Sequence, residues 1–544
     1  MSDAARIRRT ENRMKTKMWW MAAEVLLAAA MRGGAQAGAA AQGPVFNVVD
    51  YGAKNDGSAN ASDAFKRAIA AAKKAGGGTV FVPAGHYVSG PIEMVSNLTL
   101  NFDAGAIAEF PATMLPFTPG RQQGIETLTP VPLIGGHDLE NVAVVGRGVL
   151  MSNNADWMKL HARQQPSGSD PGSANGPHWE QLLNDLDAGK TISEDEYKEA
   201  AAELRPSFVR FMNSRNILIS GLRFIGSPMW TVHLLYSENA TVENLVIETY
   251  PGVHTDGIVV DSSRFVRIAN DYIDTGDDGI VIKSGKDADG LRVNRPTEDV
   301  AITNCTVHHA HGAVSIGSET SGSIRNIAAS NLTVVDSENG ARIKSARGRG
   351  GVVEDIRFDN WTMENVGEGI VVTNTYLMEG ETRKGQEPVS KTTPVFRNIA
   401  MSHMTIDGAK KLIDIDGLPE MPIVNLRITD VMGTGKAGLT AAYTDGLELH
   451  DVLLNPAVGP AFDVRHSTNL EMDDVAEGRP LAATPVIRLE DTPGAVVRNS
   501  RAFKGTGVFL ATGKGELKTI VLEGNALGDA ATAAEESDAN SSAR

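Results

Sequence analysis

The chain has 544 residues and is acidic, with 51 Lys and Arg against 67 Asp and Glu and a formal net charge of −16. This balance argues against a nucleic-acid-binding protein, because a surface that holds phosphates needs net positive charge. With 56 Gly, 5% aromatic residues and one cysteine, Cys305, the composition indicates many turns, a core of small aliphatic side chains and no intramolecular disulfide framework.

The first 42 residues have the pattern of an export signal. Basic residues from Arg6 to Lys17 precede an apolar run from Met18 to Met31, and the small residues AQAGAAAQ follow. This order is typical of a secretory signal peptide, although Glu24 interrupts the apolar run. The run is also too short for a helix that stays in a membrane. We therefore expect residues 1–42 to direct the protein to the periplasm or the medium, without stable membrane insertion.

One amphipathic helix is predicted after residue 60. The stretch Asn60 to Ser62 offers an N-cap, and Gly76 provides a stop. Between them, apolar residues recur at helical spacing: Phe65, Ala68, Ile69 and Ala72. If the following segments form a stack of repeats, this helix would cover its open end, as terminal caps must.

A short repeated pattern runs through the rest of the chain. A turn-prone residue is followed by alternating apolar and polar residues, and most copies are separated by roughly 23 to 29 residues. The copies begin at Gly221, Asn244, Asn270, Asn304, Asn331, Asn360, His403 and Asp430. Strands of four or five residues with this alternation bury one face only, so a single repeat cannot form its own core.

Stacking the repeats would bury a continuous interior. The sequence therefore predicts an all-β fold, a right-handed parallel β-helix, with the turn asparagines stacked in a ladder. A β-propeller is the alternative, but its blades need longer periods and four strands each. We expect one catalytic domain over residues 43–527, a long rim loop over 152–205 where the pattern lapses, and a disordered tail over 528–544 that is rich in Ala, Asp, Glu and Ser.

Three acids fall one repeat apart. Asp277 and Asp278 lie between two glycines, which alone would indicate a turn, but Asp256 precedes them by about one rung. Equivalent positions on successive rungs lie about 4.8 Å apart. Like charges at this range raise the pKa of one carboxyl, and glycosidic cleavage requires one protonated acid and one carboxylate that activates water. We predict that Asp277 keeps the proton.

The next rungs add a histidine and two cations to this face. His311 lies one lengthened rung beyond the acid pair, and Arg342 and Lys344 lie about one rung further. Because Arg342 and Lys344 are two residues apart on a strand, their side chains point the same way. A small cationic group beside clustered carboxylates favours an anionic sugar such as a uronate.

Four segments in this order, HTDGI, TGDDGIVIKSG, HGAVSIGSE and RIK, resemble the signature of glycoside hydrolase family 28, the polygalacturonases and related pectin hydrolases. The resemblance extends from about Val45 to Pro456 and includes the leading segments YGAKNDGSANASDAF and GGGTVFVPAGHY. It implies a right-handed parallel β-helix that hydrolyses α-1,4-galacturonosidic bonds in pectin with inversion, without a cofactor or a metal. The partner would be a pectic polysaccharide or oligosaccharide, and we expect a monomer.

The resemblance also implies roles for single residues. Asp277 would be the general acid, while Asp256 and Asp278 would hold and deprotonate the attacking water. His311 would tune the protonation of the acid. The sugar carboxylates would be bound by Arg342 and Lys344.

Two further substrate contacts follow from the resemblance. Tyr376 lies where the family often has a tyrosine that stacks on the sugar. His254 stands where the family usually has an asparagine that contacts the sugar on the leaving-group side, so this subsite departs from the family pattern.

Several alternatives remain at this stage. The clustered acids could bind calcium, as in β-helix pectate lyases, which cleave pectin by elimination. A solenoid that binds carbohydrate without turnover is the second alternative, and rhamnogalacturonan or xylogalacturonan are alternative substrates within the family. The motif IGSETSG resembles exo-acting bacterial members of the family more than the shorter endo enzymes, and residues 152–205 and 379–393 could close one end of the groove, so we expect exo action.

Overall fold

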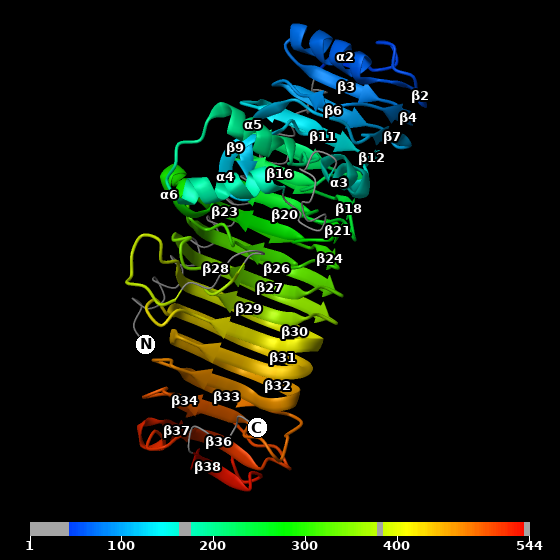
Figure 1. The fold of residues 1–544 in the computed structure, drawn as a ribbon. Coiled ribbons are helices and arrows are strands. Elements are labelled where there is room, and N and C mark those ends of the chain that lie inside the picture. Colours follow the sequence, from blue (N-terminus) through cyan, green and yellow to red (C-terminus); the bar gives the residue numbers. More distant parts are fainter. Residues whose placement is uncertain (1–42, 163–175, 378–384, 538–544) are drawn as a thin grey trace, which may run out of the picture. The chain divides into compact units, whose positions relative to one another are not determined.

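The computed structural model describes residues 43–162, 176–377 and 385–537. The predicted export segment, residues 1–42, lies outside the described residues, as do residues 163–175, 378–384 and 538–544. From Val45 onward the chain is a parallel β-helix, shown in Figure 1. Strands of successive repeats pair with one another in parallel, which confirms the predicted solenoid and excludes the propeller.

The strands form three stacks that run along the solenoid. The first stack contains β1 (Val45–Asn47), β3 (Gly78–Val82), β6 (Leu98–Phe102), β11 (Glu140–Gly146), β14 (Arg215–Ser220), β17 (Glu238–Glu243), β20 (Arg264–Ala269) and β23 (Thr297–Thr303). The second contains β2 (Asp56–Asn60), β4 (Gly85–Val88), β7 (Ala106–Glu109), β12 (Val149–Met151), β15 (Arg223–Ile225), β18 (Val246–Glu248), β21 (Tyr272–Asp274) and β24 (Thr306–His308). The third contains β5 (Ile92–Glu93), β10 (Ile134–His137), β13 (Val209–Met212), β16 (Val232–Leu235), β19 (Ile258–Asp261), β22 (Ile280–Lys283), β25 (Val314–Ile316), β27 (Asn339–Lys344) and β29 (Glu368–Thr373).

Longer strands continue across the corners in the later rungs, and the stacks merge there. These are β26 (Ile324–Val335), β28 (Val352–Glu364), β30 (Val395–Asp416), β31 (Ile423–Ala442) and β32 (Thr444–Arg465). The last rungs separate again into β33 (Glu471–Ala476), β34 (Ile487–Glu490), β35 (Val496–Arg498), β36 (Val508–Gly513), β37 (Val521–Glu523) and β38 (Thr532–Ser537), with a 3-10 turn at Leu517–Thr519.

Burial differs between the stacks. In β20 of the first stack, Val266 and Ile268 are buried while Arg264 and Arg267 are exposed, which is the alternation expected of a strand with one wet face. By contrast, β16, β19 and β22 of the third stack are buried at every position, because further chain covers their outer face. The candidate site lies on this covered stack.

The predicted asparagine ladder is confirmed. The amide Nδ2 of Asn304 donates to Oδ1 of Asn270 at 3.2 Å, Asn331 donates to Asn304 at 3.2 Å and Asn360 donates to Asn331 at 2.8 Å. Asn270 has a φ of 61°, a left-handed backbone that asparagine tolerates better than most residues. Cys305, the residue after Asn304, is a buried free thiol.

The predicted helix forms as α2 (Ser62–Lys74), near the first rungs in Figure 1. Its apolar face, which includes Phe65 and Ile69, joins the core of the solenoid. The N-cap differs from the expected one, because the helix begins after Ala61 without a side-chain cap. Instead, Oδ1 of Asn60 accepts a hydrogen bond from the backbone N–H of Ser62 at 2.8 Å.

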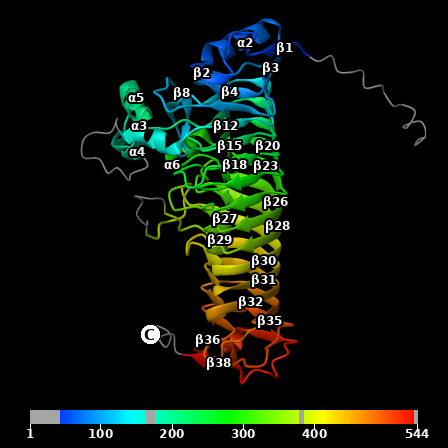
Figure 2. The ribbon, with the colours of Figure 1, turned by 90° about the vertical axis from the view of Figure 1, so that its right-hand side faces the viewer.

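The segment predicted to be a long rim loop, residues 152–205, contains three helices where the structure describes it: α3 (Asn154–Ala162), α4 (Pro177–Asp187) and α5 (Glu194–Ala202). Trp179 and Leu182 of α4 and Ala200 of α5 form a small apolar cluster with Ile125. Ile125 belongs to an antiparallel hairpin of β8 (Phe117–Gln122) and β9 (Ile125–Pro130). In Figure 2 the three helices and β8 lie on the same side of the solenoid.

The prediction of a disordered tail is wrong for its described part. Residues 532–537 form β38, which pairs in parallel with β36 and extends the third stack by one rung. Composition alone gave the wrong prediction, because a segment rich in Ala, Glu and Ser can still form a strand when the preceding rung offers backbone hydrogen-bond partners. No helix in the described part of the chain is long and apolar enough to cross a membrane.

Candidate active site

A cavity of about 980 Å³ opens on the third stack and contains every site residue that the sequence predicts. Those residues are His254, Asp256, Asp277, Asp278, His311, Arg342, Lys344 and Tyr376. The cavity also takes residues from the β8–β9 hairpin and from α4. A pocket with converging charged groups at one face is the usual place of an active site.

The three acids meet because their rungs are in register. Ile258 pairs with Ile280, so Asp256 and Asp278, each two residues earlier, lie on neighbouring rungs. Carboxylate oxygens of Asp256, Asp277 and Asp278 all lie within 4.8 Å of one another, as the rung spacing predicts. Glycine permits this close approach, since a Cβ at position 276 would lie 2.0 Å from the carbonyl oxygen of Gly252.

Asp278 is surrounded by hydrogen-bond donors. Its Oδ2 accepts a hydrogen bond from Nζ of Lys344 at 2.9 Å, and its Oδ1 accepts one from Oγ of Ser315 at 2.7 Å. Nη1 of Arg342 lies 3.8 Å from the same Oδ1. Because both carboxylate oxygens face donors, the ionised form of Asp278 is well solvated by the protein.

Asp277 forms an ion pair with His311, and its side chain is 18% exposed toward the cavity. Nδ1 of His311 lies 3.4 Å from Oδ1 of Asp277. The hydrogen bond and the charge of Asp277 raise the pKa of His311 to about 9, although burial acts in the opposite direction. Burial would raise the pKa of Asp277, but the interaction with His311 outweighs it and the pKa is lowered.

Asp256 has the raised pKa of the cluster. Its side chain is only 3% exposed, and burial, together with the negative charges of Asp277 and Asp278, raises its pKa to about 8. Lys283, whose Nζ lies 3.3 Å from Oδ2 of Asp256, acts in the opposite direction. The prediction that Asp277 keeps the proton is therefore wrong for this structure, because Asp277 has a cationic partner at its carboxylate and Asp256 is the more buried acid.

Sequence reasoning missed the group behind Asp256. Nζ of Lys283 also lies 3.4 Å from Oε1 of Glu319 and 4.3 Å from the centre of the Trp230 ring. Burial is costly for a lone charge, so a lysine inside the apolar strand IVIK was a usable signal. Its partners could not be read from the sequence, since Trp230 comes from another rung and Glu319 from a turn.

The two predicted cations, Arg342 and Lys344, lie between Asp278 and the ring of Tyr376. The guanidinium of Arg342 lies 5.1 Å from the ring centre of Tyr376, and Nζ of Lys344 lies 5.0 Å from it. The three side chains thus form one surface that combines positive charge with an aromatic ring. Such a surface can bind a sugar ring that carries a carboxylate.

The hairpin and the helical insertion both contribute residues to the lining of the cavity. Gln122 and Gln123 of the hairpin line the cavity, and Nε1 of Trp179 donates to Oε1 of Gln123 at 3.0 Å. On the other side, the backbone N–H of Lys286 donates to the carbonyl of Gly124 at 2.9 Å. These hydrogen bonds connect the tip of the hairpin to α4 and to the loop after β22. The hairpin and α4 thus form a continuous wall of the cavity.

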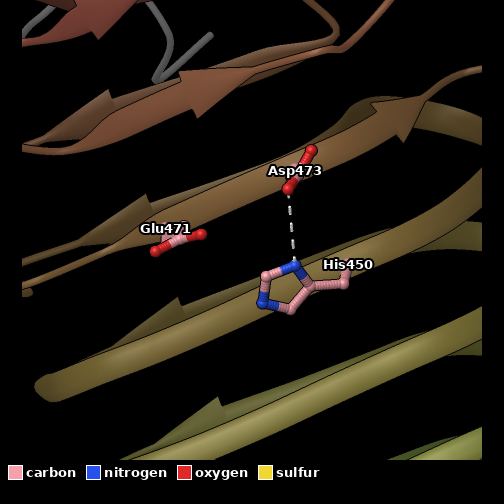
Figure 3. A group of neighbouring side chains, drawn as sticks. All are labelled: His450, Glu471 and Asp473. Carbon is pink, nitrogen blue, oxygen red and sulfur yellow. Dashed lines mark ion pairs between the residues drawn. The ribbon is translucent and has the colours of Figure 1, made fainter. Parts of the chain in front are cut away.

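A metal ion is not favoured by the donor set of the acid cluster. The carboxylates are close enough to bind a cation, but Lys344 and Lys283 already place ammonium groups 2.9 Å and 3.3 Å from them. Figure 3 shows a second group, His450, Glu471 and Asp473, on β32 and β33. There Arg498 pairs with both carboxylates, which gives them a cation from the chain itself.

Comparisons with known proteins agree with the geometry. The family described as glycosyl hydrolases family 28 matches residues 188–446, and a rhamnogalacturonase A/epimerase, pectate lyase-like family matches residues 45–144. A probable polygalacturonase of Vitis vinifera is 27% identical over 399 residues, which cover 71% of this chain and 73% of that protein. An exo-poly-alpha-D-galacturonosidase of Dickeya chrysanthemi is 25% identical over 392 residues, covering 69% and 64%.

A solved structure is similar over most of its length. The crystal structure of a hyperthermoactive exopolygalacturonase from Thermotoga maritima superimposes with a TM-score of 0.68 at 32% sequence identity. The alignment covers 76% of this chain and 92% of that chain, so nearly all of that structure has a counterpart in the present one.

Proposed function

The chain belongs to glycoside hydrolase family 28, and on that premise we propose that it hydrolyses galacturonosidic bonds in pectin and releases sugars from a chain end. The observation that carries the proposal is the cluster of Asp256, Asp277 and Asp278 beside the cations Arg342 and Lys344. Three buried acids on one face cost stability, which is expected only where chemistry needs them.

Binding uses the charged surface at the mouth of the cluster. A galacturonate carboxylate accepts hydrogen bonds from Arg342 and Lys344, and the sugar ring packs on Tyr376. Because Lys344 also holds Asp278 at 2.9 Å, the bound sugar is brought next to the acids. Binding and catalysis therefore share one residue.

The proton for the leaving group comes from the pair of His311 and Asp277. The pair holds one proton, which resides on His311 when the site is at rest, and its transfer makes Asp277 a neutral acid. Asp277 is the more exposed of the three acids, which supports its contact with the glycosidic oxygen. As the bond to the anomeric carbon breaks, Asp277 protonates the departing oxygen.

Water completes the reaction from the other side of the sugar. Asp278 takes a proton from the water while Asp256 orients it, and the water oxygen bonds to the anomeric carbon. The acids lie within 4.8 Å, closer than the roughly 6.5–9.5 Å typical of inverting enzymes. We infer inversion from membership of family 28, which assigns Asp256 and Asp278 to the attacking water and leaves none of the three acids as a nucleophile.

Release from a chain end is supported by the wall of the hairpin and α4. We infer that this wall closes one side of the cavity, which would then accommodate the end of a polymer but not its middle. The hydrogen bonds at Gln123 and Gly124 connect the hairpin to α4 and to the loop after β22. Its other proposed contributor, residues 379–393, is described only from residue 385 onward.

The test is a digestion of oligogalacturonides, rhamnogalacturonan and xylogalacturonan, followed by sizing of the products. We expect galacturonate monomer from the oligogalacturonides and unchanged activity in excess chelator, with Asp277→Asn as the inactive control. A ladder of oligomers would contradict exo action. An unsaturated uronide, detected by its ultraviolet absorbance, would show a lyase instead.

We further propose that residues 1–42 export the protein and that it acts as a monomer. The basic and apolar order of the segment supports export. N-terminal sequencing of the protein recovered outside the cytoplasm should begin near residue 43, and light scattering should give the mass of one chain. Full retention of the segment in a cytoplasmic protein would contradict the export proposal.

A further inference from the structure

The loop that carries His254 is held from both ends of the insertion. Asn154, the first residue of α3, accepts a hydrogen bond from the N–H of Val253 at 3.2 Å and donates to the carbonyl of Val253 at 3.2 Å. Arg205, just beyond α5, donates from Nη1 to the carbonyl of Val253 at 2.8 Å and to that of Pro228 at 2.7 Å. The insertion thus fixes the backbone beside His254.

Arg205 also contacts the imidazole itself. Its Nη2 lies 3.4 Å from Nδ1 of His254. A guanidinium has donors only, so Nδ1 must accept this hydrogen bond and cannot carry a proton. A neutral ring with an unprotonated Nδ1 has its proton on Nε2. The described residues provide no other hydrogen bond to His254, which lines the cavity.

The surrounding charges favour the same neutral state. Burial and the positive charges of Arg205, Lys283 and His311 together lower the pKa of His254 to about 4, while Asp277 acts in the opposite direction. Arg205 itself is almost fully buried and has both carbonyl partners, so it stays in place. A positive charge on the imidazole would therefore be repelled by three neighbouring positive charges.

We propose that Arg205 is a positioning residue that fixes His254 as a neutral imidazole, whose Nε2–H donates a hydrogen bond to a hydroxyl of the bound sugar. The inference rests on the proposed function and extends it to one subsite. Recognition is then divided, with the sugar carboxylate bound by Arg342 and Lys344 and a hydroxyl bound by His254. It also means that His254 takes no part in proton transfer.

The direct test is the protonation state of His254 in the protein without sugar. In the full chain labelled with ¹⁵N-histidine, the His254 resonance is assigned by its loss in His254→Asn. We expect Nε2 to carry the proton and Nδ1 to be unprotonated throughout pH 5 to 8. A protonated Nδ1, or a ring that titrates in this range, would overturn the proposal whether or not the protein hydrolyses pectin.

Variants separate positioning from folding. Asn154→Ala removes two bonds to Val253 but leaves Arg205 on the imidazole, so the Nε2–H form should persist. In Arg205→Lys, which keeps the charge but loses the planar fork, we expect a mixture of both tautomers. If Arg205→Lys does not fold, the spectrum of the unaltered protein still decides.

Kinetics test the sugar contact. With trigalacturonate as the substrate, His254→Ala should lower kcat/KM about tenfold, as expected for one lost hydrogen bond, while His254→Gln keeps an N–H donor and stays within about threefold. An inactive parent protein would reject the proposed function. An active parent whose His254→Ala variant is equally active would reject only this inference.

Discussion

Two sets of charged residues on the same solenoid differ in almost every respect. On the first stack, arginine and glutamate pair across neighbouring strands, and each arginine is about half exposed. We call this set the outer ladder: Arg215–Glu140, Arg264–Glu238, Arg325–Glu298 and Arg397–Glu354. On the third stack, Asp256 pairs with Lys283, Asp278 with Lys344 and Asp277 with His311. The three acids and the two lysines are each less than about a fifth exposed.

The difference in burial distinguishes charged pairs on the surface from charged residues that can take part in catalysis. Exposed ion pairs contribute little to the stability of the fold, because water already solvates both partners. Buried acids of like charge raise one another's energy and shift protons onto each other or onto a histidine. The same rung spacing brings the charges together in both sets. The sets differ because further chain covers the third stack and leaves the first stack open to solvent.

The largest effect should come from removing the proposed acid. Asp277→Asn cannot donate a proton, and we expect kcat to fall about 10³-fold on trigalacturonate. The matched acid of the outer ladder, Glu238→Gln, should keep its kcat. Equal activity of the two variants would erase the distinction between the sets.

Lys344→Ala should lower kcat/KM about 100-fold, because it removes a contact to the sugar carboxylate and the charged partner of Asp278. Lys411→Ala is the control, since Lys411 forms an ion pair with Asp414, and neither residue lines the cavity. A similar loss in both variants would point to a general effect of charge.

The pH dependence should report the pair of His311 and Asp277. Its proton is lost as the pH rises through about 9, so kcat/KM should fall about tenfold per pH unit above that value. In His311→Gln the proton must reside on a carboxyl alone, and the fall should move to lower pH. An unchanged profile would remove His311 from the mechanism.

Two neighbouring buried acids should respond to amide substitution with opposite sign. Folding raises the pKa of Asp256 from 3.8 to about 8, so its contribution to stability declines as the pH rises from about 4 to about 8. At pH 8, Asp256→Asn should raise the free energy of unfolding by about 1 kcal/mol. Asp261→Asn should lower it by about 3 kcal/mol, because Arg121, paired at 2.7 Å, would be left buried without its partner.

The smallest effect belongs to the outer ladder. Arg264→Ala should change the free energy of unfolding by less than about 0.5 kcal/mol and leave activity unchanged. Urea denaturation measures the first and trigalacturonate hydrolysis the second. A loss of several kcal/mol would mean that the ladder is a structural requirement of the solenoid.

The repeat period of the sequence predicted those features of the fold and the site that depend only on a residue's position within a rung. The rungs, the asparagine ladder and the meeting of Asp256 with Asp278 follow from the repeat length and the side-chain alternation. His311, Arg342 and Lys344 were found in the same way, because each lies near a third-stack strand.

Contacts made by segments outside the repeat could not be predicted. Arg205 lies between the insertion and the next rung, and no spacing relates it to His254. The hairpin of β8 and β9 lacks a repeat signal as well. Protonation was missed for a different reason, since the proton follows burial and partners such as Lys283, which the sequence does not place.

Cleavage of hexagalacturonate in ¹⁸O-labelled water tests the central claim most directly, with products analysed by mass spectrometry at early times. The account predicts galacturonate and pentagalacturonate from the start, with one ¹⁸O atom gained for each bond cleaved. Unsaturated products without label, or dimer and tetramer as the first products, would contradict it.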